Sequence, residues 1–179
     1  LALLLGFHFP LNFRSPYKAS SITDFWHRWH ISLSTWLRDY LYISLGGNRK
    51  GKLRTYVNLF LTMLLGGLWH GASWNFVFWG AVHGIALALH KFFRSLLGRD
   101  KRYESRGWRR VGGIVLTFHL VCFCWIFFRN STFEASWTMI HQITTNFQPQ
   151  LFWQLVDGYR AVFILMAIGF VLHFLPDRW

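Results

Sequence analysis

Residues 55–90 form a run of 36 residues without Asp, Glu, Lys or Arg, and this run restricts the possible folds more than any other feature. An uncharged apolar stretch of 18 or more residues is typical of a segment that crosses the roughly 30 Å hydrocarbon core of a bilayer. The run is too long for one crossing and too short for two full crossings with a turn. It predicts a broken or re-entrant helical hairpin: a short helix over about 56–68, an irregular segment over 69–73 and a helix over about 74–93.

A small group of polar residues lies near the middle of this uncharged run. It comprises His70, Ser73 and Asn75. Polar and ionisable side chains at membrane depth are costly unless they face protein or a wet cavity, so they mark functional sites by default. Non-helical backbone at that depth is tolerated only in the same surroundings. We therefore expect His70 to lie beside a cavity.

The rest of the chain indicates an all-α, polytopic transmembrane protein. Hydrophobic residues make up 53% of the 179 residues and charged residues 15%. Further spans are predicted over 111–128 and 161–175, with an amphipathic helix on the outer interface between them. The chain opens on an apolar segment without Met, so we expect it to be the C-terminal part of a longer protein. No repeat or linker divides it, and residues 1–179 are expected to form a single membrane domain.

The net charge of +12 would suggest nucleic acid as the partner of a soluble protein. Here the basic residues lie in short loops between apolar blocks, a pattern that favours membrane lipid and no nucleic acid. The loop 91–110 holds eight Lys or Arg, whereas 129–160 holds two. The positive-inside rule therefore predicts that the first loop is cytoplasmic and the second is outside, with the basic turn 48–54 also cytoplasmic.

An amphipathic helix is predicted over about 24–45, ahead of the uncharged run. Ser21 and Asp24 have the spacing of a capping box, and Gly46-Gly47 is a typical stop signal. On a helical wheel one side of this segment is apolar and aromatic, and the other is polar. The apolar stripe consists of Trp26, Trp29, Leu33, Trp36 and Tyr40. Such a helix should lie at the membrane interface or line a cavity.

Metal binding is an alternative explanation for the nine histidines. His27 and His30 are three residues apart, and His83 and His90 are seven apart, but protein metal sites usually add carboxylates or tighter histidine clusters. We therefore expect no metal site. Haem ligation by His83 and His119 stays open as an alternative. A single helical histidine such as His83 is more often a packed, hydrogen-bonded residue than a catalyst.

His70 differs from the other histidines in its central position between Trp69 and Gly71. A neutral imidazole there is suited to take a proton from a hydroxyl acceptor that attacks an activated acyl carbon, because its unperturbed pKa of roughly 6.5 fits general-base work near neutral pH. His30 would hold the acceptor or stabilise the developing oxyanion. No Gly-x-Ser-x-Gly elbow offers a covalent nucleophile, which favours direct transfer.

Several long, ordered motifs resemble the membrane-bound O-acyltransferase family, in its bacterial branch of alginate O-acetylation and D-alanyl transfer. They are Phe9-Pro10-Leu11-Asn12-Phe13, Ser15-Pro16-Tyr17, residues 25–43, Leu45-Gly46-Gly47-Asn48-Arg49, and Leu65-Gly66-Gly67-Leu68-Trp69-His70-Gly71-Ala72. The resemblance implies that His70 is the catalytic histidine and His30 the second functional histidine. It also implies earlier spanning helices that complete a funnel around His70. We expect substrate contacts from Trp69, Asn75, Arg38 and Asp39.

The resemblance implies an O-acyltransferase, most simply an O-acetyltransferase, in the bacterial cytoplasmic (inner) membrane. It would use an acyl thioester, acetyl-CoA or an acyl carrier, as donor substrate, with no bound cofactor. The acceptor would be a hydroxyl of an extracytoplasmic polysaccharide or an acetyltransferase-like relay partner. The alternative is a non-enzymatic membrane transport module in which histidines relay protons. Inverted repeats would favour transport, and the sequence contains none that we can recognise.

Overall fold

The computed structural model describes residues 3–98 and 105–175, and within these ranges it contains helices and no strand, which confirms the predicted all-α class. Four elements are short helical turns: η1 (Leu3–Leu5), η2 (Pro16–Lys18), η3 (Leu37–Tyr42, π-helical) and η4 (Pro149–Leu151). The α-helices are α1 (Ile22–Arg28), α2 (Ile31–Trp36), α3 (Gly51–His70), α4 (Trp74–Leu96), α5 (Trp108–Arg129), α6 (Phe133–Thr145), α7 (Phe152–Gly158) and α8 (Arg160–Phe174).

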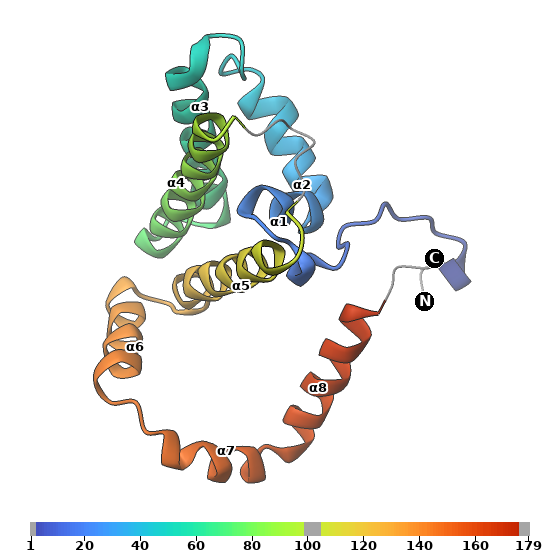
Figure 1. The fold of residues 1–179 in the computed structure, drawn as a ribbon, viewed down its shortest axis with the longest axis vertical. Helices are drawn as coiled ribbons and strands as arrows, with labels where there is room; N and C mark the ends of the chain where they lie inside the picture. The colour runs from blue at the N-terminus through green and yellow to red at the C-terminus, as the bar shows by residue number, and fades with distance from the viewer. Residues whose placement is uncertain (1–2, 99–104, 176–179) are drawn as a thin grey trace.

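Helices α3 and α4 form a hairpin whose backbones touch (Figure 1). A Cβ atom added to Gly67 would lie 2.3 Å from the carbonyl oxygen of Phe76, and one added to Gly80 would lie 2.5 Å from that of Met63. Only glycine permits this approach, as is common between helices in lipid. The close contact fixes how the end of α3, with its histidine, sits against the start of α4.

The predicted hairpin is confirmed, but its first helix is longer than predicted. Helix α3 begins at Gly51 and runs through His70, so Trp69 and His70 belong to its last turn and not to the irregular segment. The break is confined to residues 71–73. Gly71 has φ 155°, a conformation that suits glycine, and the Ser73 hydroxyl accepts a hydrogen bond from the Asn75 amide at 3.3 Å to start α4.

Two helices in the described part of the chain are long and apolar enough to cross a membrane: α4 and α5. Helix α3 is not among them. The segments 149–158 and 160–174 meet at 94° and would give a third crossing if they form one broken span. Helix α5 confirms the predicted apolar helix over 111–128, and α8 matches the helix predicted over 161–175. The chain is a membrane protein.

The single helix predicted over 24–45 is wrong. It is divided into α1, α2 and η3, with the break at Trp29 and His30. The predicted aromatic stripe is divided with it: Trp26 is buried against α4, whereas Trp36 and Tyr40 are exposed and stack on each other at 5.6 Å.

The break is stabilised by the loop that precedes α1. His30 adopts the left-handed conformation, with φ 45°. Asn12 accepts hydrogen bonds from the two backbone amides that follow His30. Its carbonyl oxygen accepts from the Ile31 amide at 3.0 Å, and its Oδ1 accepts from the Ser32 amide at 3.1 Å. On the other side of the break, the Arg14 amide donates to the Arg28 carbonyl at 2.9 Å. These contacts come from residues 14 to 20 positions away, which a local sequence pattern does not reveal.

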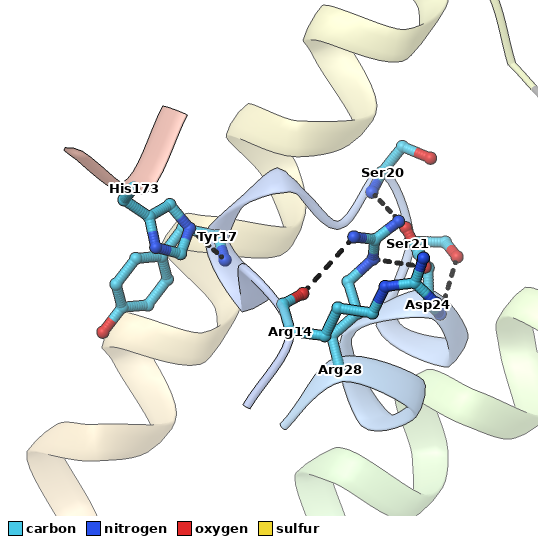
Figure 2. A network of polar contacts seen from close by, with 7 residues as sticks. All are labelled: Arg14, Tyr17, Ser20, Ser21, Asp24, Arg28 and His173. Carbon is cyan, nitrogen blue, oxygen red and sulfur yellow. Dashed lines mark hydrogen bonds and ion pairs between the residues drawn. The ribbon is translucent and has the colours of Figure 1, made fainter. Parts of the chain in front are cut away.

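Helices α6, α7 and α8 form an arc that leaves α5 and returns toward the start of the chain (Figure 1). Where the arc returns, the Tyr17 amide donates to Nε2 of His173 at 3.1 Å, and their rings lie 4.9 Å apart (Figure 2). The Lys18 ammonium donates to the Leu175 carbonyl at 2.6 Å. These contacts join the end of α8 to the segment that leads into α1.

Candidate active site

His70 lies in a cage of aromatic rings at the turn of the α3–α4 hairpin. Its ring centroid is 4.9 Å from that of Trp69, 5.4 Å from that of Trp79 and 5.0 Å from that of Phe128. These rings meet His70 by their edges or faces, and they come from α3, α4 and α5. The cage fixes the imidazole in orientation while leaving it partly exposed.

The surroundings of His70 favour its neutral form. Burial lowers the pKa of His70, and the nearby His30 lowers it further. His30, at the α1–α2 break, therefore lies close enough to His70 to disfavour the charged form of its ring. A neutral imidazole can accept a proton near neutral pH.

His30 presents an unusual combination of backbone strain and an unpaired ring nitrogen. Its left-handed conformation is disfavoured for any residue with a Cβ atom. Its Nδ1 is buried, and among the residues that the structure describes it has no hydrogen-bond partner. Strained residues and orphaned polar atoms are both enriched at functional sites. The nitrogen therefore retains an unused hydrogen-bonding capacity beside the site.

Arg38 and Asp39 form a two-point ion pair on the outer side of η3. The Arg38 Nε donates to Asp39 Oδ1 at 2.7 Å, and the Arg38 Nη2 donates to Asp39 Oδ2 at 3.1 Å. The hydrogen bond from Arg38 lowers the pKa of Asp39. The preceding Leu37 is buried and packs on Gly66, which is one turn before His70 on the same face of α3. The Arg38 and Asp39 side chains are exposed beside the site, outside the aromatic cage.

Trp69 and Asn75 differ in exposure: the first side chain is largely exposed and the second is buried. Trp69 is 63% exposed and covers the His70 ring from outside. Asn75 is 1% exposed, and both ends of its amide are used: Nδ2 donates to the Asn130 carbonyl at 2.8 Å, and Oδ1 accepts from the Ser136 hydroxyl at 3.3 Å. Asn75 thus ties the start of α4 to the α5–α6 turn and holds no free polar atom toward His70.

His83 is a packed core residue, as its sequence context predicted. It is 1% exposed and accepts a hydrogen bond from the Trp26 indole at 3.3 Å. Trp79 contacts its ring at 4.7 Å and also the His70 ring, so one side chain joins the core to the site. The indole nitrogen of Trp79 is buried and has no partner in the described ranges. The sequence analysis missed Trp79; its position four residues before His83, on one helix face, was the available signal.

Other histidines are separate from this site. Nδ1 of His90 lies 2.8 Å from the Thr23 hydroxyl, near the far end of α4. His27 is exposed, and the break after α1 divides it from His30. Within residues 3–98 and 105–175, no three His, Cys, Asp or Glu side chains are grouped so that they could hold a metal ion.

Comparison with known proteins identifies relatives of this chain. A model of the membrane-bound O-acyltransferase family matches residues 1–130. The chain is 46% identical over 169 residues to the probable alginate O-acetylase AlgI of Pseudomonas aeruginosa, covering 94% of this chain and 30% of that protein. It is 44% identical over 136 residues to the peptidoglycan O-acetyltransferase of Helicobacter pylori, covering 76% and 25%. It is 31% identical over 141 residues to the teichoic acid D-alanyltransferase of Bacillus subtilis, covering 75% and 36%. The chain thus spans about a quarter to a third of the length of these relatives.

Proposed function

Because this chain belongs to the membrane-bound O-acyltransferase family, we propose that it carries the catalytic histidine of an O-acyltransferase that acts on a polymer hydroxyl. The observation that supports this most is the buried Nδ1 of His30, which has no hydrogen-bond partner among the described residues, together with the aromatic cage around His70. The named relatives are acyl-transferring enzymes, which favours acyl transfer over the transport module.

In the proposed reaction, His70 acts as a general base. Its neutral imidazole takes the proton of the acceptor hydroxyl while the hydroxyl oxygen forms a bond to the thioester carbonyl carbon. The carbonyl oxygen becomes an oxyanion, which His30 Nδ1 stabilises when it carries the proton. The oxyanion then reforms the carbonyl and the carbon–sulfur bond breaks. The thiolate leaves and takes the proton from the His70 imidazolium.

The remaining predicted site residues fall into two groups, those that could contact a substrate and one that positions the site. Trp69, exposed on the outer side of His70, is suited to contact the acceptor or donor directly. The Arg38–Asp39 pair is suited to hydrogen-bond a polar substrate at the edge of the site. Asn75 is buried and doubly hydrogen-bonded, so we assign it a positioning role, in which it holds the start of α4 and hence the wall around His70.

We propose an acyl thioester, acetyl-CoA or an acyl carrier, as donor, and an extracytoplasmic polysaccharide or an acetyltransferase-like relay protein as acceptor. No resident cofactor is needed for the proton transfers described above. The proposed location is the bacterial inner membrane, crossed several times by the whole protein. The relatives named for alginate, peptidoglycan and teichoic acid modification support a polymer acceptor.

The test is the His70→Ala variant of the whole membrane-embedded protein, assayed with radiolabelled acetyl-CoA and, in a second series, with an acetylated carrier protein. Loss of a general base should lower the transfer rate by about 10² to 10⁴. The matched control is His141→Ala, because His141 is exposed on α6, away from the aromatic cage. Transfer by the His70 variant at the control rate would refute the assignment.

A further inference from the structure

Of the four aromatic rings that contact His70 within the described residues, only Trp79 is buried. The four rings belong to Trp69, Phe76, Trp79 and Phe128. Trp69 and Phe128 are exposed and Phe76 is partly exposed, whereas Trp79 is 6% exposed. A ring packed in the core keeps one position, so Trp79 limits the orientations that the imidazole can adopt.

The described part of the chain holds the His70 imidazole by ring contacts alone. Within residues 3–98 and 105–175 this imidazole has no hydrogen-bond partner. Catalytic histidines are often oriented by a hydrogen bond from the second ring nitrogen to a carboxylate or a carbonyl. In this site the packing of rings must supply the orientation, and the Trp79 ring meets the imidazole at 5.4 Å and 89°.

Trp79 is itself fixed by its ring and by its backbone. Its ring lies 5.8 Å from that of Trp26 and 4.7 Å from that of His83, and both neighbours are buried. The next residue, Gly80, is in backbone contact with α3, where an added Cβ would lie 2.5 Å from the Met63 carbonyl oxygen. The indole therefore has a fixed place relative to α3 and to the imidazole at its end.

The indole nitrogen argues that Trp79 does more than fill the core. Nε1 is buried and has no partner among the residues that the structure describes. An unpaired buried donor costs stability, and a phenylalanine at this position would avoid that cost. Costs of this kind are typical of functional sites. A role that depends on the large flat ring explains why a tryptophan stands here.

We propose that Trp79 is a positioning residue whose ring holds the His70 imidazole in the orientation that removes the acceptor proton. This inference rests on the role proposed for His70 as general base. Trp79 contacts neither donor nor acceptor in this scheme, so its loss should lower kcat and leave KM unchanged. In Trp79→Leu we expect kcat to fall about 10- to 100-fold, the effect of a small misplacement of a catalytic group.

The experiment measures kcat and KM as a function of pH for Trp79→Leu, Trp79→Phe and a control in the whole membrane-embedded protein. Phenylalanine keeps a ring against the imidazole and should restore most of the rate. Burial lowers the pKa of His70, so the leucine variant should bring this pKa back toward its ordinary value. Because the neutral imidazole is the active form, activity of the leucine variant should then fall off at a higher pH on the acid side than in wild type.

The matched control is Leu87→Ala, which removes core volume from the same helix about two turns further on. It should lower the unfolding temperature and leave kcat and its pH dependence unchanged. A second readout does not depend on turnover: diethyl pyrocarbonate modifies neutral imidazoles, and mass spectrometry of the peptide that contains His70 gives the modification rate. This rate should rise in Trp79→Leu and not in Leu87→Ala, because only the first opens the wall beside the imidazole.

A leucine variant with wild-type kcat, pH dependence and modification rate would overturn the inference. A phenylalanine variant as slow as the leucine variant would also overturn it, because the indole N–H and not the ring would then be required. A failure of the proposed function is distinct from both results, since it would appear as transfer by His70→Ala.

Discussion

His30 is the residue at which stability and function are expected to conflict. A left-handed conformation at a residue with a Cβ atom costs about 1–2 kcal/mol, and glycine avoids that cost. His30→Gly should therefore unfold at a higher temperature than wild type and yet transfer acyl groups more slowly, because the imidazole is lost. Thermal unfolding in detergent and the acetyl-transfer rate are the two measurements.

His30→Asn is the control for backbone geometry. Asn tolerates the left-handed conformation better than most residues, so this variant keeps the break between α1 and α2 while it removes the ring. We expect its transfer rate to fall as far as that of the glycine variant. Wild-type activity in His30→Asn would mean that only the backbone turn matters and that Nδ1 has no part in the reaction.

His83 should affect stability far more than chemistry. In His83→Leu the Trp26 indole loses its acceptor inside the core, which should cost about 1–3 kcal/mol. The matched control is His119→Leu, because His119 is exposed and its ring contacts only the Val115 carbonyl of its own helix among described polar groups. The measurement is the unfolding temperature, followed by the transfer rate below it. A folded His83 variant that transfers no acyl group would contradict the structural role.

Some residues of the site could be predicted from the sequence and others could not. His70 stands out in the sequence because an ionisable side chain in a long uncharged run marks a functional site, and Trp69 is its neighbour in the chain. Trp79 was missed although it stands four residues before His83, because it is one of 11 tryptophans and its unpaired indole becomes visible only in three dimensions. The buried hydrogen bond between the Ser136 hydroxyl and Asn75 could not be predicted either, because the two residues are 61 positions apart in the chain.

At the scale of the elements, the α3–α4 hairpin depends on glycines that meet backbone atoms. Gly80→Ala should push the helices apart, because its Cβ would lie 2.5 Å from the Met63 carbonyl oxygen and neither backbone can yield easily. The expected destabilisation is about 1–3 kcal/mol, as for overpacked cores. Gly112→Ala is the control: it lies within α5 with nothing within 4 Å of the added atom. Alanine there should be neutral or mildly stabilising.

Thermal unfolding of the two glycine variants in the same detergent decides this prediction. A Gly80→Ala variant as stable as wild type would show that α3 and α4 separate without cost. Since the hairpin also positions His70 against Trp79, the transfer rate of the Gly80 variant should fall along with its unfolding temperature.

Most helices could be predicted from the periodicity and length of apolar segments, which are local properties of the sequence. The length of the uncharged run predicted the hairpin and its break, and the span predicted over 111–128 is part of α5. The break at His30 did not follow, because neither Gly nor Pro marks it and because Asn12 and Arg14 supply its hydrogen bonds from a distance. Tertiary contacts therefore overrode a helical pattern over 24–45.

At the scale of the whole molecule, the orientation in the membrane is still a prediction from charge. The segment 91–110, which includes the end of α4 and the start of α5, carries eight basic residues, whereas 129–160 carries two. The positive-inside rule places the first loop in the cytoplasm and the second outside. Helix α5 is a candidate span between them, so the two loops must lie on opposite faces if it crosses.

Single cysteines at Ser105 and Asn146, in a Cys122→Ala, Cys124→Ala background, test this orientation with a membrane-impermeant maleimide. On intact cells Asn146→Cys should be labelled and Ser105→Cys should not, whereas both should react after the membrane is permeabilised. Asn146 is exposed at the end of α6, so its thiol is accessible whichever face it occupies. Labelling at 105 alone would invert the orientation, and labelling at both sites in intact cells would mean that α5 does not cross.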